Sequence, residues 1–214
     1  MSTPGWQRIT DHGGLAVLLI RHGRTALNAE HRFCGGRSDP PLDDKGRAQA
    51  RELATRLGEA PIERVFSSPQ LRARETAAAL ERGELTLLED LRELDQGELE
   101  GREIHPALAE HAEFFRKWKR DPTYISVPGG ENMGQLAERT HAAMDELLEG
   151  LDARGRVRSP QVVAVVGHQM AHGAFVCRAL GKPLREWQQF ALRNATANLL
   201  AWDGRSWSLM ARNL

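Results

Sequence analysis

The chain has 214 residues, which is long enough to bury a sizeable core, and we expect one domain over residues 1–214. Its 29 lysines and arginines equal its 29 aspartates and glutamates, so no whole-chain basic field is present to hold nucleic acid or an anionic membrane. With no membrane-length apolar run, no secretory signal and only Cys34 and Cys177 as cysteines, the sequence predicts a cytoplasmic protein without nucleic-acid or membrane partners.

The first elements in the chain are a tail and two strands. Residues 1–14 are polar and contain glycine, which predicts a loose tail. Residues 15–20 are uniformly apolar, as in a strand that is covered on both faces, and residues 162–166 repeat this pattern further along. Residues 62–66 predict a shorter strand, which ends at a Ser-Ser-Pro sequence that favours the start of a helix.

Helices and a terminal hairpin complete the pattern. Apolar residues recur at helical spacing in residues 43–57, 104–120 and 133–148. Residues 198–211 form two strand-like runs around Asp203 and Gly204, which predicts a hairpin. Because strands alternate with helices, we predict an α/β fold, a three-layer sandwich in which helices flank a mostly parallel central sheet.

Polar side chains follow three of the predicted strands. Arg21 and His22 follow the first, Ser67 and Ser68 the second, and His168 the strand at residues 162–166. Ligands of such sheets gather beyond the carboxyl ends of the strands, so we expect these side chains to meet at one edge.

The residue types at this edge are suited to an anion. The planar guanidinium of Arg21 matches phosphate or carboxylate oxygens, and His22 beside it can be a nucleophile, a base or a ligand. Arg72 lies near the start of the next predicted helix and can reach back to the same edge. Glu93 follows another strand-like run, where it is either a surface charge or, close to a phosphate, a proton donor.

Six segments, in this order, resemble the motifs of the histidine phosphatase superfamily, also called the phosphoglycerate-mutase-like family. They are RHGRTALN (21–28), RFCGGRSDPPL (32–42), SSPQLRARETA (67–77), LRELDQGELEG (91–101), PGGEN (128–132) and VVGHQ (165–169). The resemblance extends from residue 15 to about residue 210 and is closest to the small phosphatase branch. It implies a phosphoric monoester hydrolase with a small helical cap inserted at about residues 102–128.

The resemblance also implies a role for each candidate catalytic residue. His22 would be the nucleophile that becomes phosphorylated, while Arg21, Arg72 and His168 would surround the phosphoryl oxygens. Glu93 would protonate the leaving alkoxide and then take a proton from water. The substrate-binding residues that the resemblance implies are Thr25, Asn28, Cys34, Gly35 and Gln169. No cofactor is expected.

Two other chemistries fit the sequence less well. His168 and His172 have the four-residue spacing of metal ligands on a helix, but the glutamate of the zinc-protease pattern is missing, so we expect no metal and interpret His172 as a packing residue. A cysteine-dependent phosphatase needs an arginine six residues after its cysteine. Here those positions hold Pro40 and Pro183.

The length of the cap distinguishes the two main activities within the family. Only 26 residues separate Gly101 from Pro128, which leaves less material to shield a phosphohistidine from water than the longer insertion of the mutases. The sequence therefore favours a metal-independent phosphatase of a small phosphorylated metabolite. The alternatives are a phosphoglycerate mutase and, more distantly, a non-catalytic phosphate-binding or interaction module.

Two further features of the chain stay open from the sequence. Arg116, Lys119 and Arg120 in the cap are either a solvated face or a means of selecting acidic substrates. An edge strand, or the aromatic residues near Trp118 and Trp187, is compatible with a homodimer.

Overall fold

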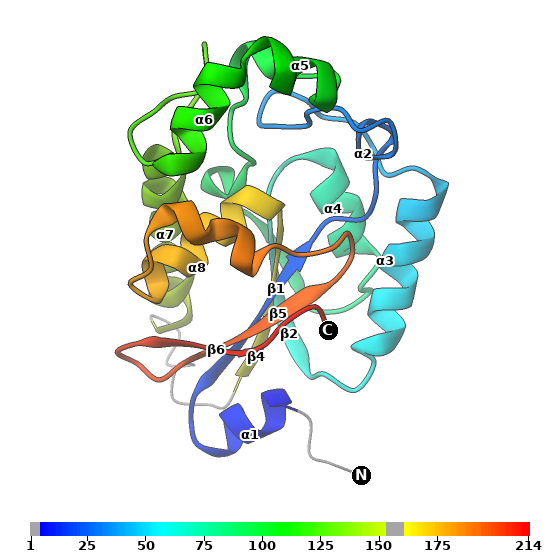
Figure 1. The fold of residues 1–214 in the computed structure, drawn as a ribbon. Helices are drawn as coiled ribbons and strands as arrows, with labels where there is room; N and C mark the ends of the chain where they lie inside the picture. Colours follow the sequence, from blue (N-terminus) through cyan, green and yellow to red (C-terminus); the bar gives the residue numbers. More distant parts are fainter. Residues whose placement is uncertain (1–4, 153–160) are drawn as a thin grey trace.

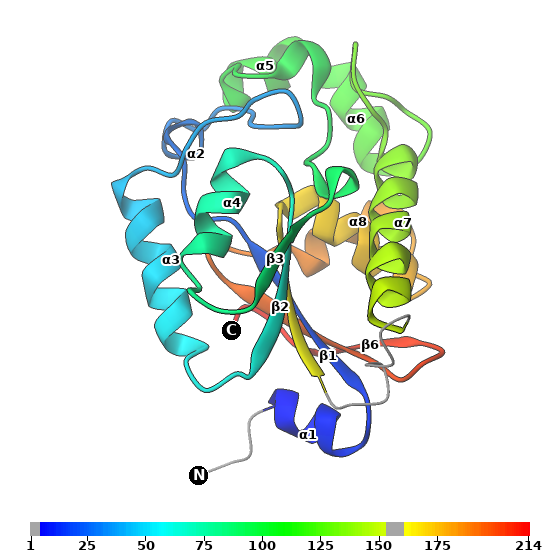
Figure 2. The ribbon, with the colours of Figure 1, turned by 180° about the vertical axis from the view of Figure 1, so that it is seen from behind.

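A single mixed sheet forms the centre of the molecule. The computed structural model describes residues 5–152 and 161–214, and Figures 1 and 2 show it from opposite sides. Within these residues the strand order is β3-β2-β4-β1-β5-β6. The strands are β1 (Leu15–Arg21), β2 (Ile62–Ser67), β3 (Glu84–Leu87), β4 (Gln161–Gly167), β5 (Ala197–Trp202) and β6 (Trp207–Ala211). The first four are parallel, and β5 and β6 form the predicted hairpin. This arrangement confirms the α/β fold class.

Helices cover both faces of the sheet, so the molecule has three layers. The helices α3 (Asp44–Arg56) and α4 (Leu71–Ala78) lie on one face, and α7 (Met133–Asp152) and α8 (Gln169–Ala179) lie on the other (Figures 1 and 2). Alternate residues of β1 explain this arrangement. Val17 and Leu19 belong to the apolar core beneath α7 and α8, while Leu18 and Ile20 belong to the core beneath α3 and α4. The shorter helical segments are α2 (Ala26–Ala29), η1 (Glu89–Leu91), η2 (Gly97–Leu99) and η3 (Leu184–Phe190).

The pairing of β1 with β4 determines where polar side chains leave the sheet. The two strands run parallel in a register that places Arg21 opposite Gly167. The backbone N–H of His22 then donates to the carbonyl of Gly167 over 3.0 Å. The residues that follow the two strands, His22 and His168, therefore leave the sheet side by side.

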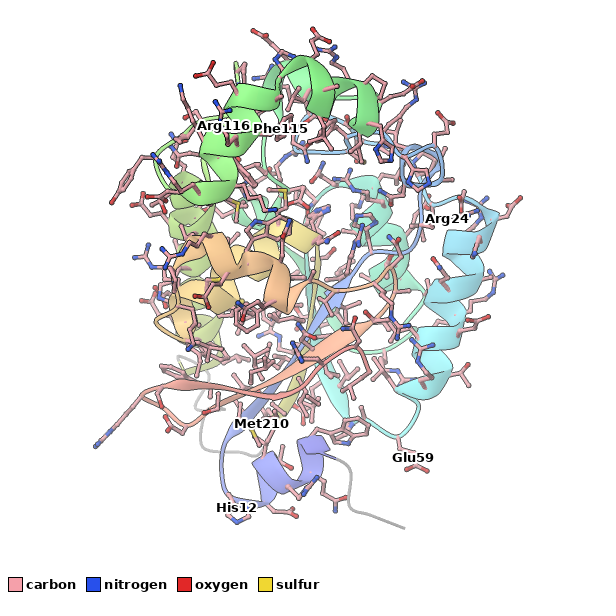
Figure 3. The ribbon with its side chains drawn as sticks, viewed as in Figure 1. His12, Arg24, Glu59, Phe115, Arg116 and Met210 are labelled. Carbon is pink, nitrogen blue, oxygen red and sulfur yellow. The ribbon has the colours of Figure 1, made fainter. Side chains whose placement is uncertain are left out.

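The predicted cap helix is two helices, α5 (Ile104–Glu110) and α6 (Ala112–Arg120), so the expectation of one continuous helix is wrong. The break is at His111, which has φ −106° and ψ 32° and accepts a hydrogen bond from Arg102 at Nε2. After the break, Phe115 stacks on Phe33 with ring centroids 6.1 Å apart. The cap lies beyond the carboxyl end of β1, and Figure 3 shows Phe115 and Arg116 at that end and His12 at the other.

The predicted N-terminal tail is also corrected in part. Residues Gly5–Asp11 form helix α1, which lies at the opposite end of the sheet from the cap, while residues 1–4 lie outside the described residues (Figure 1). Ile9 is buried in the core shared with β1 and β5, and Trp6 packs against it. A seven-residue helix has little stability alone, so this packing is what holds it. Among the described residues, no helix is both long and apolar enough to cross a bilayer.

Candidate active site

The carboxyl ends of the parallel strands bring the candidate catalytic residues together. His22 follows β1, His168 is the N-cap of α8 directly after β4, and Arg72 is the second residue of α4, the helix that follows β2. The rings of His22 and His168 are 5.1 Å apart between centroids. His22, Arg72, Glu93 and His168 are all buried. Polar groups with this degree of burial require partners, so their hydrogen bonds indicate what the site is built to hold.

His22 is held as a neutral imidazole. Its Nδ1 lies 2.7 Å from the carbonyl oxygen of Gly23. Because a carbonyl can only accept, Nδ1 carries the proton and Nε2 keeps a free electron pair. Burial lowers the pKa of His22 well below its usual value, and the positive charges of Arg72 and Arg21 lower it further. The ring is therefore neutral near pH 7, with Nε2 available as a nucleophile.

His168 is oriented by a serine. Its Nε2 lies 2.9 Å from the hydroxyl oxygen of Ser68, and that oxygen accepts the backbone N–H of Gln70 over 3.3 Å. The hydroxyl is thus free to donate its proton to Nε2, which places the ring proton of His168 on Nδ1. Burial, followed by the charge of Arg72, lowers the pKa of His168 well below its usual value, so this ring is also neutral.

The two arginines use part of their donors on backbone carbonyls. Arg72 donates from Nη1 to Ser38 over 2.7 Å and from Nη2 to Gly35 over 3.0 Å. Arg21 donates from Nη1 to Leu192 over 2.8 Å. Burial lowers the pKa of Arg21, the nearby carboxylate of Glu93 raises it and the charge of Arg72 lowers it, so these three side chains interact electrostatically. The carbonyl bonds fix the direction of each guanidinium.

Three buried donors in this group have no acceptor within residues 5–152 and 161–214. They are Nε of Arg21, Nε of Arg72 and Nδ1 of His168. Buried N–H groups are almost always hydrogen-bonded in folded proteins, and a cluster of unpartnered donors around a neutral histidine is suited to an anion with several oxygens. The arrangement can therefore hold a phosphoryl group against Nε2 of His22.

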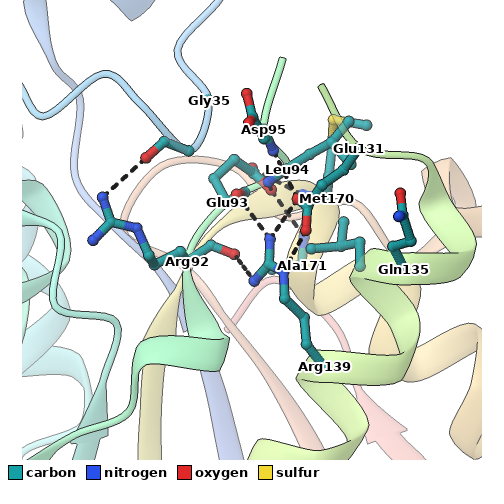
Figure 4. A network of polar contacts seen from close by, with 12 residues as sticks. Gly35, Arg92, Glu93, Leu94, Asp95, Glu131, Gln135, Arg139, Met170 and Ala171 are labelled. Atoms are coloured by element: carbon teal, nitrogen blue, oxygen red, sulfur yellow. Dashed lines mark hydrogen bonds and ion pairs between the residues drawn. The ribbon is translucent and has the colours of Figure 1, made fainter. Parts of the chain in front are cut away.

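Glu93 lies at the beginning of α8, the helix that His168 starts. Its carboxylate accepts the backbone N–H groups of Met170 over 3.1 Å, Ala171 over 3.0 Å and Leu94 over 2.9 Å (Figure 4). Helix N-termini have free N–H groups and a partial positive charge, so a carboxylate is well placed there. Glu93 is thereby fixed close to both His168 and Arg21.

Two of the predicted substrate-binding residues form a local cap next to His22. Thr25 is the N-cap of α2, and its side chain and that of Asn28 each accept the other's backbone N–H over 3.3 Å. Asn194 donates to the carbonyl of His22 over 3.1 Å and to the side chain of Asn28 over 3.4 Å. These bonds stabilise the loop that carries the nucleophile.

The other three predicted substrate-binding residues lie around the acid and the arginine. The carbonyl of Gly35 accepts from Arg72, and a Cβ at Gly35 would come within 2.5 Å of the backbone carbonyl oxygen of Leu94, so the position requires glycine. Cys34 beside it is half-buried, and burial raises the pKa of its thiol. Gln169 is half-buried and begins α8 directly after His168.

Sequence reasoning missed several residues that support this site. It gave no role to Gln70, Glu131, Arg139 or Asn194, and it placed Ser68 at the sheet edge without assigning a bond. Ser68 was detectable from its position directly after a strand. Gln70 and Glu131 lie inside two of the segments that resemble family motifs, but the sequence assigns them no role. Arg139 and Asn194 are single polar residues that no local pattern distinguishes from surface residues.

His172 does not form a metal site with His168. Its Nε2 donates to the carbonyl of Ile20 over 3.0 Å, as expected for a packing histidine, and burial lowers its pKa to about 4. In the described part of the chain, no cluster of three or more His, Cys, Asp or Glu side chains is arranged to hold a metal ion.

A family model, a curated protein and solved structures all resemble this chain over most of its length. The family model described as histidine phosphatase superfamily (branch 1) matches residues 17–214. Probable phosphoglycerate mutase GpmB from Salmonella choleraesuis is 35% identical over 197 residues, which cover 90% of this chain and 87% of that protein. The solved mycobacterial glucosyl-3-phosphoglycerate phosphatase in complex with VO3 has a TM-score of 0.82 at 27% identity, covering 92% of this chain and 98% of that one. A putative alpha-ribazole-5'-P phosphatase from Escherichia coli shares the fold, with a TM-score of 0.81 at 24% identity over 94% of this chain and 96% of that one.

Proposed function

This chain belongs to the histidine phosphatase superfamily, and we propose that it is a metal-independent phosphatase that hydrolyses small phosphate monoesters through a phosphohistidine at His22. The observation that carries the proposal is the set of buried donors without acceptors, on Arg21, Arg72 and His168, around a neutral imidazole. Fixed donors directed at the phosphoryl oxygens supply the main stabilisation in phosphoryl transfer. Loss of one such donor typically costs about 2.7 to 4 kcal/mol of transition-state stabilisation.

The first step transfers the phosphoryl group to the protein. Nε2 of His22 uses its electron pair to form a bond to phosphorus, and the bond between phosphorus and the ester oxygen breaks. Glu93, which takes up a proton when the phosphate dianion binds beside it, gives that proton to the departing alkoxide and is left as a carboxylate. The Nδ1–H bond to Gly23 holds the ring in the orientation that this attack requires.

The second step releases inorganic phosphate. A water molecule attacks the phosphorus of the phosphohistidine while the carboxylate of Glu93 takes a proton from that water. The bond between nitrogen and phosphorus breaks, and its electron pair returns to Nε2 of His22. Both the nucleophile and the acid are thereby restored to their starting states.

A phosphoglycerate mutase is the second candidate. It is supported by the 35% identity to a probable phosphoglycerate mutase. The short segment between Gly101 and Pro128 supports hydrolysis instead, because a smaller cap gives water easier access to the phosphohistidine. A non-catalytic phosphate-binding module is less well supported, since all five groups that the reaction requires are present. The cytoplasmic location and a homodimer remain predictions of the sequence.

One assay separates these functions. The protein is incubated with p-nitrophenyl phosphate and, separately, with 3-phosphoglycerate plus a bisphosphoglycerate primer, with a chelator present in both. Phosphate release supports hydrolysis, isomerisation without release supports the mutase, and binding of phosphate without either reaction supports the module. A phosphatase that loses its activity in the chelator would contradict metal independence.

The role of His22 has its own test. We expect His22→Ala to abolish both turnover and the acid-labile phosphoenzyme that is trapped by rapid quenching. His12→Ala is the matched control, because His12 lies at the opposite end of the molecule (Figure 3). A phosphoenzyme that persists in the His22 variant would transfer the nucleophilic role to another residue.

A further inference from the structure

The backbone of Glu93 is held on both sides by side chains from outside its own loop. Its N–H donates to Oε1 of Gln70 over 2.9 Å, and its carbonyl accepts from Nη2 of Arg139 over 3.0 Å. Gln70 is 1% exposed, and Arg139 is anchored by Glu131 through two bonds of 2.8 Å (Figure 4). The position of the carboxyl group therefore depends on both contacts.

Gln70 also connects this peptide to the loop that orients Arg72. Its Nε2 donates to the carbonyls of Gly35 over 3.0 Å and Ser38 over 2.9 Å. These are the same two carbonyls that accept the guanidinium of Arg72. A continuous set of hydrogen bonds thus runs from the phosphate-facing arginine, through two carbonyls and one buried amide, to the backbone of the candidate acid.

The amide of Gln70 serves these two loops and not its own helix, and its Nε2 also lies 3.3 Å from the carbonyl oxygen of Gly36 in the loop that orients Arg72. Gln70 is the N-cap of α4, but its side chain makes no capping bond to that helix. A buried side chain that gives up the usual capping bond and spans two loops determines the distance between those loops. Here the two loops carry the groups that hold the phosphate and donate the proton.

We propose that Gln70 is a positioning residue for proton transfer, which sets the distance between Glu93 and the phosphoryl group held by Arg72, with Arg139 as the second anchor of the Glu93 peptide. This inference rests on the proposed phosphatase function. A misplaced acid slows reactions that need a proton on the leaving group and has little effect on those that do not. The structure therefore makes a specific kinetic prediction.

The test is a comparison of leaving groups. Kinetics of wild type, Gln70→Met and Glu93→Gln are measured with p-nitrophenyl phosphate, whose leaving group departs without help, and with an alkyl phosphate, whose leaving group requires a proton. We expect Gln70→Met to reduce kcat/KM about ten- to a hundredfold for the alkyl ester and less than about threefold for the nitrophenyl ester, with the same selectivity as Glu93→Gln. Equal losses on both esters, or no loss on either, would overturn the proposal.

Asn198→Leu is the matched control for stability. Asn198 is also a buried amide that joins two segments, because it donates to Phe190 and accepts from Asn213, but it lies in β5 and does not contact Glu93. We expect it to lower the melting temperature without changing the ratio of the two rates. If Gln70→Met does not fold, Arg139→Lys tests the second anchor of the Glu93 peptide by the same comparison of esters, since one ammonium cannot reproduce the bonds of the guanidinium. Absence of wild-type activity on both esters would refute the proposed function instead.

Discussion

A single hydroxyl group determines which nitrogen of His168 faces the site. Ser68 accepts from Gln70 and therefore has its proton free for Nε2 of His168. Without this bond the two tautomers of the imidazole would differ less in energy, and a fraction of the molecules would direct an acceptor instead of a donor at the phosphate. The hydroxyl of the adjacent Ser67 instead donates to the carbonyl of Ser68.

We expect Ser68→Ala to lower kcat/KM for p-nitrophenyl phosphate about tenfold, which corresponds to about 1.4 kcal/mol, because part of the population loses a hydrogen bond to the transition state. Ser67→Ala is the control, since Ser67 is equally buried but does not contact His168. Steady-state kinetics of both variants provide the measurement. Equal activity of the two variants would show that Ser68 does not orient the ring.

At the residue scale, the sequence predicts the groups that carry chemistry better than the groups that support them. The sequence predicts Arg21, His22 and His168 at one edge of the sheet because each follows a predicted strand. The pairing of β1 with β4 brings them together at that edge. Gln70 and Arg139 are fixed only when loops distant in the chain come together. Their contacts span 35 and 46 residues, so no local periodicity contains them.

At the scale of whole elements, long apolar runs in the sequence predict strands correctly, whereas helical periodicity in residues 104–120 does not predict where the helix ends. Every residue of β4, and every residue of β1 except Arg21, is buried, and the continuous apolar runs of the two strands are sufficient to predict them. The helix expected over residues 104–120 breaks at His111, whose ring accepts from Arg102, and after the break α6 packs Phe115 on Phe33 and Trp118 on Trp187. Helical periodicity does not report such tertiary contacts.

The aromatic contact of α6 leads to a prediction about the cap. Phe115 is the residue that joins α6 to the loop of Cys34 and Gly35, through its stack on Phe33. We expect Phe115→Ala to lower the free energy of unfolding by about 1 to 3 kcal/mol and to raise KM, because a loosened cap leaves this loop less ordered. Urea denaturation and steady-state kinetics measure the two effects.

Tyr124→Ala is the control for the cap. Tyr124 follows α6 and is 84% exposed, so we expect its loss to change stability by less than about 0.5 kcal/mol. Limited proteolysis adds an independent measurement, since a loosened α6 is cleaved faster. A Phe115 variant with wild-type stability and an unchanged cleavage rate would show that the cap is held by other contacts.

At the scale of the whole molecule, three buried histidines link folding to pH. Burial lowers the pKa of His22, His168 and His172, the last to about 4. In the unfolded chain each has a pKa of about 6.5. Above that pH both states are neutral at these positions, so their contribution to stability is fully present. Below it the unfolded state binds protons that the folded state excludes, and stability falls.

The free energy of unfolding is therefore expected to fall steeply as the pH is lowered, beginning near pH 6.5. Because its pKa falls from about 6.5 in the unfolded chain to about 4 in the fold, His172 alone lowers the free energy of unfolding by about 2 kcal/mol between pH 6.5 and pH 5, and His22 and His168 act in the same direction. Exposed carboxylates with lowered pKa, such as Glu110 and Asp203, act in the same direction but only at lower pH. Urea denaturation at several pH values, without phosphate in the buffer, measures the slope.

His172→Gln removes one of the three titrating imidazoles. His172 is buried behind the site, and the amide that replaces it can still donate to the carbonyl of Ile20. The variant is expected to lose stability between pH 6.5 and pH 5 about 2 kcal/mol less than wild type does, whatever its stability at pH 7. Identical slopes would mean that His172 takes up its proton in the folded state. Such a result would place a charge beside Ile20 and the end of β1, which is incompatible with a dry core beneath the strand that presents the nucleophile.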